Sequence, residues 1–438
     1  MERYDRYKDS GIEWIGESPE HWDLAKLSYC FSLIGSGSTP KAGASEYYNN
    51  GTINWLQTGD LNNNDIYTTS KKITQIATAD YSSLKVYPVD SLVIAMYGAT
   101  IGKTGMLKIE TATNQACCVL SNPVNVNNHY AFYWLNSVKE QVISLSYGGG
   151  QHNISQELIR NLKIQIPPLQ EQTAIANYLD RKTTEIDALI AKKKRLLELY
   201  EEEKTAIINH AVTKGINPDA PMKDSGIPWL GEVPEHWEVK KLKNVVSKVG
   251  SGVTPRGGSS VYQTQGIPLL RSQNVYFDGL RLDDVAYISE SIDEQMPNSR
   301  VVEGDVLLNI TGASIGRCNF IPEDFGPGNV NQHVCIIRPL KYFIQTEYMF
   351  FVLRSIIGQH QIEIEQTGAN REGLNFEQLK NFVIPLPEMK EQHNITFYLF
   401  NSIKSIEKKT LDANQQIALL SEYRTALISE VVTGKVRV

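Results

Sequence analysis

The stretch that decides the fold runs from residue 170 to 215 and reads QEQTAIANYLDRKTTEIDALIAKKKRLLELYEEEKTAIINHAVTKG. It contains no proline, and its only glycine is its last residue. Apolar residues recur at spacings of three, four or near-multiples, which is the pattern of one helix face. That face comprises Ile175, Leu179, Ile186, Leu189, Leu197, Tyr200 and Ile207. An unbroken helix of this length would reach about 65 Å, which no compact domain needs internally.

A second charged stretch, residues 390–435, repeats this pattern at an offset of 220. A long helix with a narrow apolar face needs a partner, and two helices of matched length and pattern favour an intramolecular coiled-coil-like pair. The alternative is two unrelated surface helices. The predicted helix-pair interface comprises Leu179, Ile186, Leu197, Tyr200, Ile207, Leu399, Ile406, Ile417, Leu420 and Leu427.

The chain is a tandem duplication. An opening motif, KDSGIEWIGESPEHW at residues 8–22, returns as KDSGIPWLGEVPEHW at residues 223–237, with twelve of fifteen positions identical. GSGSTP at 35–40 matches GSGVTP at 250–255, and GATIGK at 98–103 matches GASIGR at 312–317. Asn-Gln at 114–115 matches Asn-Gln at 331–332. Each unit therefore has an opening motif, a globular part and a long helix.

Within each globular part, short β-branched and apolar runs alternate with turns rich in Gly, Ser and Asn, which is typical of strands. One helix is expected before each exit, over residues 130–145 and 345–357. We therefore predict an α+β fold with two mostly-β domains. The expected ranges are 1–168 for the first domain, 169–215 for the central helix, 216–388 for the second domain and 389–438 for the distal helix.

Composition is that of a globular protein, with 438 residues and a formal net charge of −6. An acidic balance argues against a stand-alone nucleic-acid binder, so any DNA contact is local or shared with a more basic partner. No segment has the length and apolar character of a membrane span or signal peptide. The five cysteines form no CxxC pair, and they are expected to be buried thiols in a reducing cytoplasm.

No catalytic or metal-binding pattern is found. GATIGKTG comes close to a phosphate-binding loop, but only three residues separate its glycines where the motif needs four. We interpret it as a tight turn after a buried strand. The eight histidines have no metal-ligand spacing. His21 and His236 share one place in the opening motif, where a structural hydrogen bond is the simpler interpretation.

The order of these motifs resembles the specificity subunit of type I restriction-modification systems over nearly the whole chain. The resemblance implies two target recognition domains in pseudo-twofold arrangement, each reading one half of an asymmetric bipartite site in double-stranded DNA. It implies that the long helices pack antiparallel, separate the domains and dock two methyltransferase subunits, and that motor-nuclease restriction subunits join for cleavage. S-adenosylmethionine, ATP and magnesium would belong to those partners, and this chain would carry no cofactor.

Base readout needs donors and acceptors that reach the major groove from loops. Candidates in the first domain are Ser36, Ser38, Thr39, Lys41, Gln57, Thr58, Asp60, Tyr97, Lys103, Gln151 and His152. Candidates in the second are Ser251, Thr254, Arg256, Arg271, Gln273, Asn274, Arg317, Asn370 and Arg371. A motif that both domains share cannot encode two different half-sites. Specificity is therefore expected where the copies diverge: Gln57 against Arg271, Gly59 against Gln273, and Gln151 against Arg371.

Two alternatives belong to other classes. The chain could be a non-catalytic structural adaptor whose paired domains bind protein rather than DNA, which a mobility shift with partner subunits and duplex DNA would test. It could also be a methyltransferase or nuclease in its own right, which turnover by the isolated chain would reveal.

Overall fold

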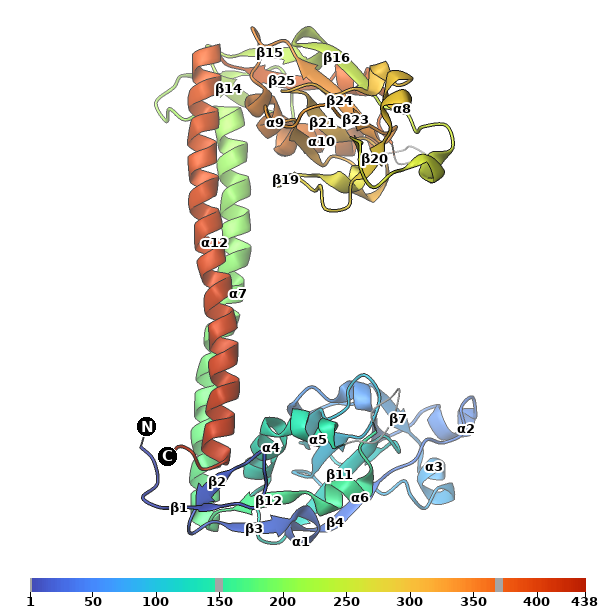
Figure 1. The fold of residues 1–438 in the computed structure, drawn as a ribbon, viewed down its shortest axis with the longest axis vertical. Helices are drawn as coiled ribbons and strands as arrows, with labels where there is room; N and C mark the ends of the chain where they lie inside the picture. Colours follow the sequence, from blue (N-terminus) through green and yellow to red (C-terminus); the bar gives the residue numbers. More distant parts are fainter. Residues whose placement is uncertain (1, 146–152, 367–372) are drawn as a thin grey trace. The chain divides into compact units, whose positions relative to one another are not determined.

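The computed structural model describes residues 2–145, 153–366 and 373–438, and it divides into two compact units (Figure 1). Unit 1 comprises residues 1–194 and 414–438, and unit 2 comprises residues 195–413. Both long helices are continuous across this division: α7 is Leu169–Lys214 and α12 is Met389–Val432. Each unit therefore contains one globular domain and a segment of both helices, which is the predicted α+β tandem architecture. The domain boundaries expected from the sequence stay predictions.

The two helices pack antiparallel within each unit. In unit 1, Leu179 and Ile186 near the start of α7 share a buried cluster with Leu427 near the end of α12. The Arg424 guanidinium also donates two hydrogen bonds to the Asp187 carboxylate, at 2.9 and 3.1 Å. In unit 2 the order is reversed, because the end of α7 packs with residues near the start of α12.

The predicted interface residues differ in burial along the helices. The fully buried ones are Leu179, Ile186, Leu399, Ile406 and Leu427, and the half-buried ones are Leu197, Tyr200, Ile207, Ile417 and Leu420. Leu189, which the periodicity placed on the apolar face, is instead 46% exposed. Its neighbour Ile190 packs against the cluster of unit 1 in its place. This drift arises because 3.6 residues per turn does not divide evenly into a seven-residue repeat.

The first domain is built on a five-stranded sheet. Its order is β4 (Phe31–Ser36), β11 (Cys117–Pro123), β8 (Leu92–Ala95), β9 (Thr104–Leu107) and β6 (Asn64–Ile66). A second sheet has the order β10 (Thr111–Thr113), β5 (Ile53–Leu56) and β7 (Lys71–Ile73). Two-stranded pairs are β1 (Tyr7–Asp9) with β2 (Glu17–Pro19), and β3 (Asp23–Lys26) with β12 (Lys163–Ile166). Short helices are α1 (Leu27–Cys30), α2 (Ser45–Tyr48), α3 (Gln75–Asp80) and α6 (Gln156–Asn161).

The second domain repeats this plan. Its main sheet has the order β16 (Val246–Ser251), β24 (Val334–Pro339), β21 (Val306–Asn309) and β22 (Cys318–Phe320). The smaller sheet has the order β20 (Ala286–Ile288), β17 (Ile267–Leu270) and β23 (Asn329–Val330). The pairs are β13 (Met222–Asp224) with β14 (Glu232–Pro234), β15 (Glu238–Lys241) with β25 (Val383–Leu386), and β18 (Val275–Tyr276) with β19 (Gly279–Leu280). Short helices are α8 (Glu290–Glu294) and α11 (Phe376–Lys380).

The single helix predicted before each exit is wrong in both domains, because two helices lie there. In the first domain these are α4 (Asn128–Ser137) and α5 (Lys139–Ser144), with a break at Val138 where φ is −102° and ψ is 11°. In the second they are α9 (Thr346–Arg354) and α10 (Ile356–Gln366). The break there falls at Ser355, whose backbone is extended and whose hydroxyl donates to the carbonyl of Val352. No glycine or proline marks the break at Val138, whereas Gly358 follows the break at Ser355 and lies where a Cβ would meet the Leu353 carbonyl.

Each opening motif packs against the first turn of a long helix. The ring of His21 hydrogen bonds to the Glu171 carboxylate at 2.9 Å, and the Trp22 indole donates to the same carboxylate at 3.2 Å. In unit 2, His236 contacts the Glu391 carboxylate at 2.7 Å. A carboxylate in the first turn of a helix also interacts favourably with its macrodipole. The structural interpretation of the two histidines therefore agrees with the observed contacts.

The same motifs also meet the ends of the helices. Gly215 after α7 and Gly434 after α12 both have left-handed backbones, with φ of 75° and 76°. A Cβ at Gly215 would lie 3.3 Å from the Trp237 ring, and one at Gly434 would lie 3.0 Å from the Trp22 ring. Glycine is therefore required twice over, by backbone conformation and by close approach. Each opening motif thus joins the start of one helix to the end of the other.

The first domain contacts α7 through a polar network. The Tyr133 hydroxyl donates to Asp180 at 2.7 Å and lies 3.1 Å from the Thr183 hydroxyl, while His129 lies 3.3 Å from the Asp180 carboxylate. The hydrogen bond with Asp180 raises the pKa of His129. Burial raises the pKa of Asp180, but hydrogen bonds from His129 and Tyr133 outweigh burial and leave that pKa lowered. In the second domain the corresponding contact is apolar, with the rings of Phe351 and Phe400 at 5.1 Å.

This difference predicts a pH dependence confined to unit 1. Because the folded pKa of His129 is raised, its contribution is full below the unfolded pKa and is lost as pH rises through the folded value. Because the pKa of Asp180 is lowered, its contribution is lost only as pH falls through that lowered value. Both side chains are more than a third exposed, so we expect the pair to add less than about 1 kcal/mol.

Urea unfolding of the wild type and of His129→Gln at a series of pH values checks this. The difference in unfolding free energy should be largest in mildly acidic buffer and should decline at alkaline pH. A difference that grows as pH rises would contradict the assignment.

The five cysteines are buried and unpaired in the structure, as predicted. Burial raises the pKa of Cys30 to about 11, and that of Cys118 and of Cys335 to about 12 each. Among the described residues, no helix is both long and apolar enough to cross a membrane. The same ranges contain no group of three His, Cys, Asp or Glu side chains placed to hold a metal ion.

Candidate nucleic-acid interface

Loops from separate strands of the first domain meet around the shared pair Asn114–Gln115. The backbone N–H of Asn114 donates to the Leu56 carbonyl at 3.0 Å, which joins it to the end of β5. The Thr39 hydroxyl, from the loop after β4, donates to the Gln115 side chain. Met96, just after β8, donates its backbone N–H to the carbonyl of Ala116 at 2.8 Å. Residues 114–116 therefore link three loops.

The second domain repeats the arrangement contact by contact. Asn331 donates its backbone N–H to the Leu270 carbonyl at 3.0 Å, and the Thr254 hydroxyl donates to the Gln332 side chain. Ile310 donates its backbone N–H to the carbonyl of His333 at 3.0 Å. These contacts support the interpretation of the shared turns as structural. They bring the diverged residues of each copy onto equivalent loops.

The predicted residues of the first domain fall mainly in these loops. Lys41 is exposed, and Ser36, Gln57, Thr58, Tyr97 and Lys103 are half-buried. The Ser36 hydroxyl donates to Gln156 at 3.0 Å, and Ser38 donates its backbone N–H to the Thr113 carbonyl at 3.1 Å. The Lys103 ammonium donates to the Asn62 side chain at 3.1 Å. The structure thus groups most of the predicted set but gives several members internal partners.

In the second domain, the exposed residue Asp284 contacts two predicted residues. The Arg271 guanidinium donates to the Asp284 carbonyl at 2.9 Å, and the Gln273 amide donates to the Asp284 carboxylate at 2.7 Å. The Arg271 guanidinium also lies over the Tyr262 ring, 5.8 Å from its centroid. Arg256 is exposed, whereas the Ser251 hydroxyl donates to the Gly252 carbonyl at 3.2 Å.

Two predicted residues bond the backbone of their own loops. The Asp60 carboxylate accepts from the backbone N–H of Gln57 at 2.9 Å and from that of Ser70 at 3.1 Å. The buried Asn274 side chain accepts from the backbone N–H of Arg271 at 2.9 Å and donates to the Arg281 carbonyl at 2.8 Å. Both are therefore positioning residues in this structure. The remaining candidates, Gln151, His152, Asn370 and Arg371, lie outside the described residues.

A hollow of about 420 Å³ opens beside these loops in the second domain. It contains the predicted Gln273 and Arg317, together with two residues that the sequence reasoning missed, Thr311 and His333. The Thr311 hydroxyl lies 2.6 Å from His333 Nδ1. A signal was available in the sequence, because Thr311 aligns with Tyr97 and His333 aligns with Ala116. These are two further positions at which the copies diverge beside shared motifs.

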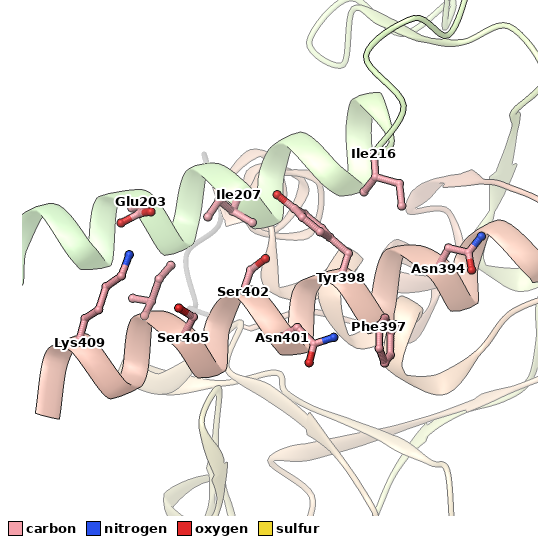
Figure 2. Close-up of a pocket in the computed structure, with 11 residues that line it drawn as sticks. Glu203, Ile207, Ile216, Asn394, Phe397, Tyr398, Asn401, Ser402, Ser405 and Lys409 are labelled. Carbon is pink, nitrogen blue, oxygen red and sulfur yellow. The ribbon is translucent and has the colours of Figure 1, made fainter.

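A groove of about 590 Å³ lies between α7 and α12 within unit 2 (Figure 2). Figure 2 shows Ile207 on the α7 side and Tyr398, Ser402 and Ser405 on the α12 side. Phe397 and Tyr398 are 66% and 43% exposed, and contiguous exposed apolar side chains mark surfaces that bind other molecules. The groove and its aromatic rim are a candidate docking surface for another protein.

These features define a class of protein with two related loop-bearing domains, each packed with segments of the same two long antiparallel helices. A family model described as the type I restriction modification DNA specificity domain matches residues 19–199 and 234–417. The chain therefore belongs to the family of type I restriction-modification specificity subunits.

Curated relatives agree over nearly the full length. The MjaIX specificity subunit of Methanocaldococcus jannaschii is 24% identical, covering 97% of this chain and 95% of its own length. The EcoKI specificity subunit of Escherichia coli is 22% identical, covering 96% and 90% respectively.

Among solved structures, the HsdS subunit of Thermoanaerobacter tengcongensis has the same fold, with a TM-score of 0.57, 16% identity and coverage of 96% and 98%. A chain from a structure on complex assembly and conformational transition of the type I R-M system has a TM-score of 0.73 at 16% identity, covering 95% and 98%.

Proposed function

We propose that this chain is the DNA-recognition subunit of a type I restriction-modification complex and reads an asymmetric bipartite target, with one half-site per domain. The proposal rests on one observation: the two domains share the same supporting contacts but carry different side chains on their loops. Thr39–Gln115 and Thr254–Gln332 make the same contact in both domains. The residues beside them differ between the copies. A shared frame that presents different side chains is suited to reading two different sequences.

In this proposal the chain is non-catalytic and scaffolds the subunits that do the chemistry. Two methyltransferase subunits would bring S-adenosylmethionine, and motor-nuclease subunits would bring ATP and magnesium. The net charge of −6 fits such sharing, because phosphate contacts dominate affinity for DNA and partners can supply them.

The test is to map methylated bases in cells that express the full chain with its methyltransferase subunits. We expect a bipartite asymmetric motif. Arg271→Ala should relax the half-site read by the second domain by about 1–3 kcal/mol of base discrimination and leave the other half-site intact. The matched control is Gln57→Ala in the first domain, which should have the opposite selectivity. If purified complex gives no sequence-selective shift of duplex DNA, the adaptor alternative is favoured instead.

The groove in unit 2 gives a prediction about the partner. Phe397→Ala should weaken methyltransferase binding at least tenfold, because large aromatic side chains on exposed surfaces contribute most to interfaces. Leu411→Ala is the control, since Leu411 is 57% exposed in the same unit but does not line the groove. Titration calorimetry with the isolated methyltransferase subunit measures both. Equal affinities for the two variants would place the docking surface elsewhere.

A further inference from the structure

A series of hydrogen bonds with one direction leads from Thr254 and Gln332 to His333 and Thr311, which line the hollow in the second domain. The Thr254 hydroxyl donates to Gln332 Oε1, and Gln332 Nε2 lies 3.1 Å from His333 Nε2. An amide nitrogen can only donate, so His333 Nε2 accepts and the neutral ring carries its hydrogen on Nδ1. That N–H then donates to the Thr311 oxygen at 2.6 Å.

A hydrogen-bond donor remains available at the end of this series of hydrogen bonds. With its oxygen accepting from His333, Thr311 keeps a hydroxyl hydrogen that has no further acceptor among the described residues. Arg317 lines the same hollow, with its guanidinium 4.7 Å from the centroid of the Tyr276 ring. No carboxylate is among the lining residues. The hollow therefore presents donors and suits a ligand that offers acceptors.

A buried residue fixes the shape of this hollow. Asn309 is fully buried, and its side-chain nitrogen donates to the Ser272 carbonyl at 2.8 Å and to the Ser314 hydroxyl at 3.2 Å. Both serines line the hollow, so Asn309 ties two of its walls together. The aligned residue in the first domain is Ala95, which has no side chain to make such a tie. The tie between these two walls is thus a feature of the second copy.

The first domain places a different pair at the equivalent positions. Tyr97 aligns with Thr311 and Ala116 aligns with His333, and the backbone contacts that hold these positions are the same in both copies. The first domain thus has a large and a small residue, Tyr97 and Ala116, where the second has a small and a large one, Thr311 and His333. Volume-conserving exchanges of this kind preserve packing while they change the polar groups that are presented.

We propose that Thr311 and His333, with Arg317, form the acceptor-binding part of the second domain's readout site, and that Tyr97 and Ala116 occupy the same place in the first. The ligand is a cluster of hydrogen-bond acceptors, supplied by the O6 and N7 edge of guanine in the major groove or by a backbone phosphate. This inference rests on the proposed function and names the residues of that site.

Thr311→Val and His333→Ala test the proposal in the full chain with its methyltransferase subunits, by methylation mapping and by DNA affinity at several salt concentrations. Thr311→Val keeps the shape and removes the donor. If the ligand is a base, both variants should lose about ten- to hundredfold preference at one and the same position of the second half-site. If it is a phosphate, both should weaken all sequences equally, and the salt slope should stay unchanged because neither substitution removes a cationic side chain.

Two further variants complete the design. Thr311→Ser keeps the donor and should behave as the wild type, and thermal unfolding of each variant verifies that it is folded. The double variant should lose no more than either single one, because the two side chains act as one unit.

Failure of the proposed function and failure of this inference would give different results. A wild-type chain without any bipartite methylation motif would overturn the proposed function. If the wild type and Arg271→Ala behave as expected, but Thr311→Val and His333→Ala change neither motif, affinity nor salt slope, this inference alone is overturned.

Discussion

Deleting residues 197–203 of α7 together with residues 406–412 of α12 is expected to shorten the unread gap in the target by about three base pairs. The two segments lie opposite each other in unit 2, where the Lys409 ammonium is 5.7 Å from the centroid of the Tyr200 ring. Seven residues are two helical turns and about 10 Å of length, and base pairs stack at about 3.4 Å. Removing a whole heptad keeps the apolar face in phase.

The measurement is again the methylation motif, in which both half-sites should persist while the number of unread bases falls. Deleting the seven residues from α7 alone is the control. It leaves a heptad of α12 without a partner and should reduce stability rather than yield a shorter gap. An unchanged gap in the matched deletion would refute the idea that helix length sets the spacing of the half-sites.

The second large effect is expected from Gln172→Leu and Gln392→Leu. Both side chains are fully buried, one residue after the glutamate that contacts each opening motif. Gln172 Nε2 donates to the carbonyls of Asn125 and Pro167 at 3.2 and 2.8 Å, and its Oε1 accepts from the Asn127 N–H at 2.7 Å. Leucine would remove all three bonds, of which the one to Pro167 is buried and the other two are part-buried.

Gln392 makes the corresponding three bonds, to the Phe343 and Pro387 carbonyls and from the Gln345 N–H, at 2.9 to 3.0 Å. Each variant leaves one buried group unpaired, at about 1–3 kcal/mol, and loses two part-buried bonds, at about 1 kcal/mol each, so it should lose on the order of 3–5 kcal/mol of unfolding free energy.

Hydrogen exchange combined with urea unfolding would locate the effect. Gln172→Leu should lower protection in the first domain only, and Gln392→Leu in the second only. Gln170→Leu is the matched control, because Gln170 is exposed in the same helical turn. Equal losses in all three variants would show that the two buried glutamines do not dock the domains on their helices.

The duplication and both long helices could be predicted from the sequence because each rests on local information. The apolar spacing of α7, the glycine at its end and the repeat of the opening motif are all readable within short windows. Local information was insufficient at Val138, where the helix break lacks glycine or proline, and at Ser355, where Gly358 lies three residues further on, inside the second helix. Local information was also insufficient at Leu189, because a shift of one residue in the apolar pattern of a long helix decides which side chain faces the partner helix.

The candidate site depended on contacts between strands far apart in the sequence. The sequence indicated that Arg271, Gln273 and Asn274 form one diverged loop, but Asn274 bonds its own loop while Asp284 holds the other two. Asp284 and His333 follow this loop by many residues, and no periodicity connects them to it.

By itself, the sequence therefore determined that the chain is two copies of one domain on a pair of matched helices, because helix periodicity and repetition are encoded in adjacent residues. Only the tertiary structure decided which diverged side chains share a surface. The pairing of Thr311 with His333 depends on β21 and β24 lying next to each other in the sheet, and strand pairing is a non-local property of the fold.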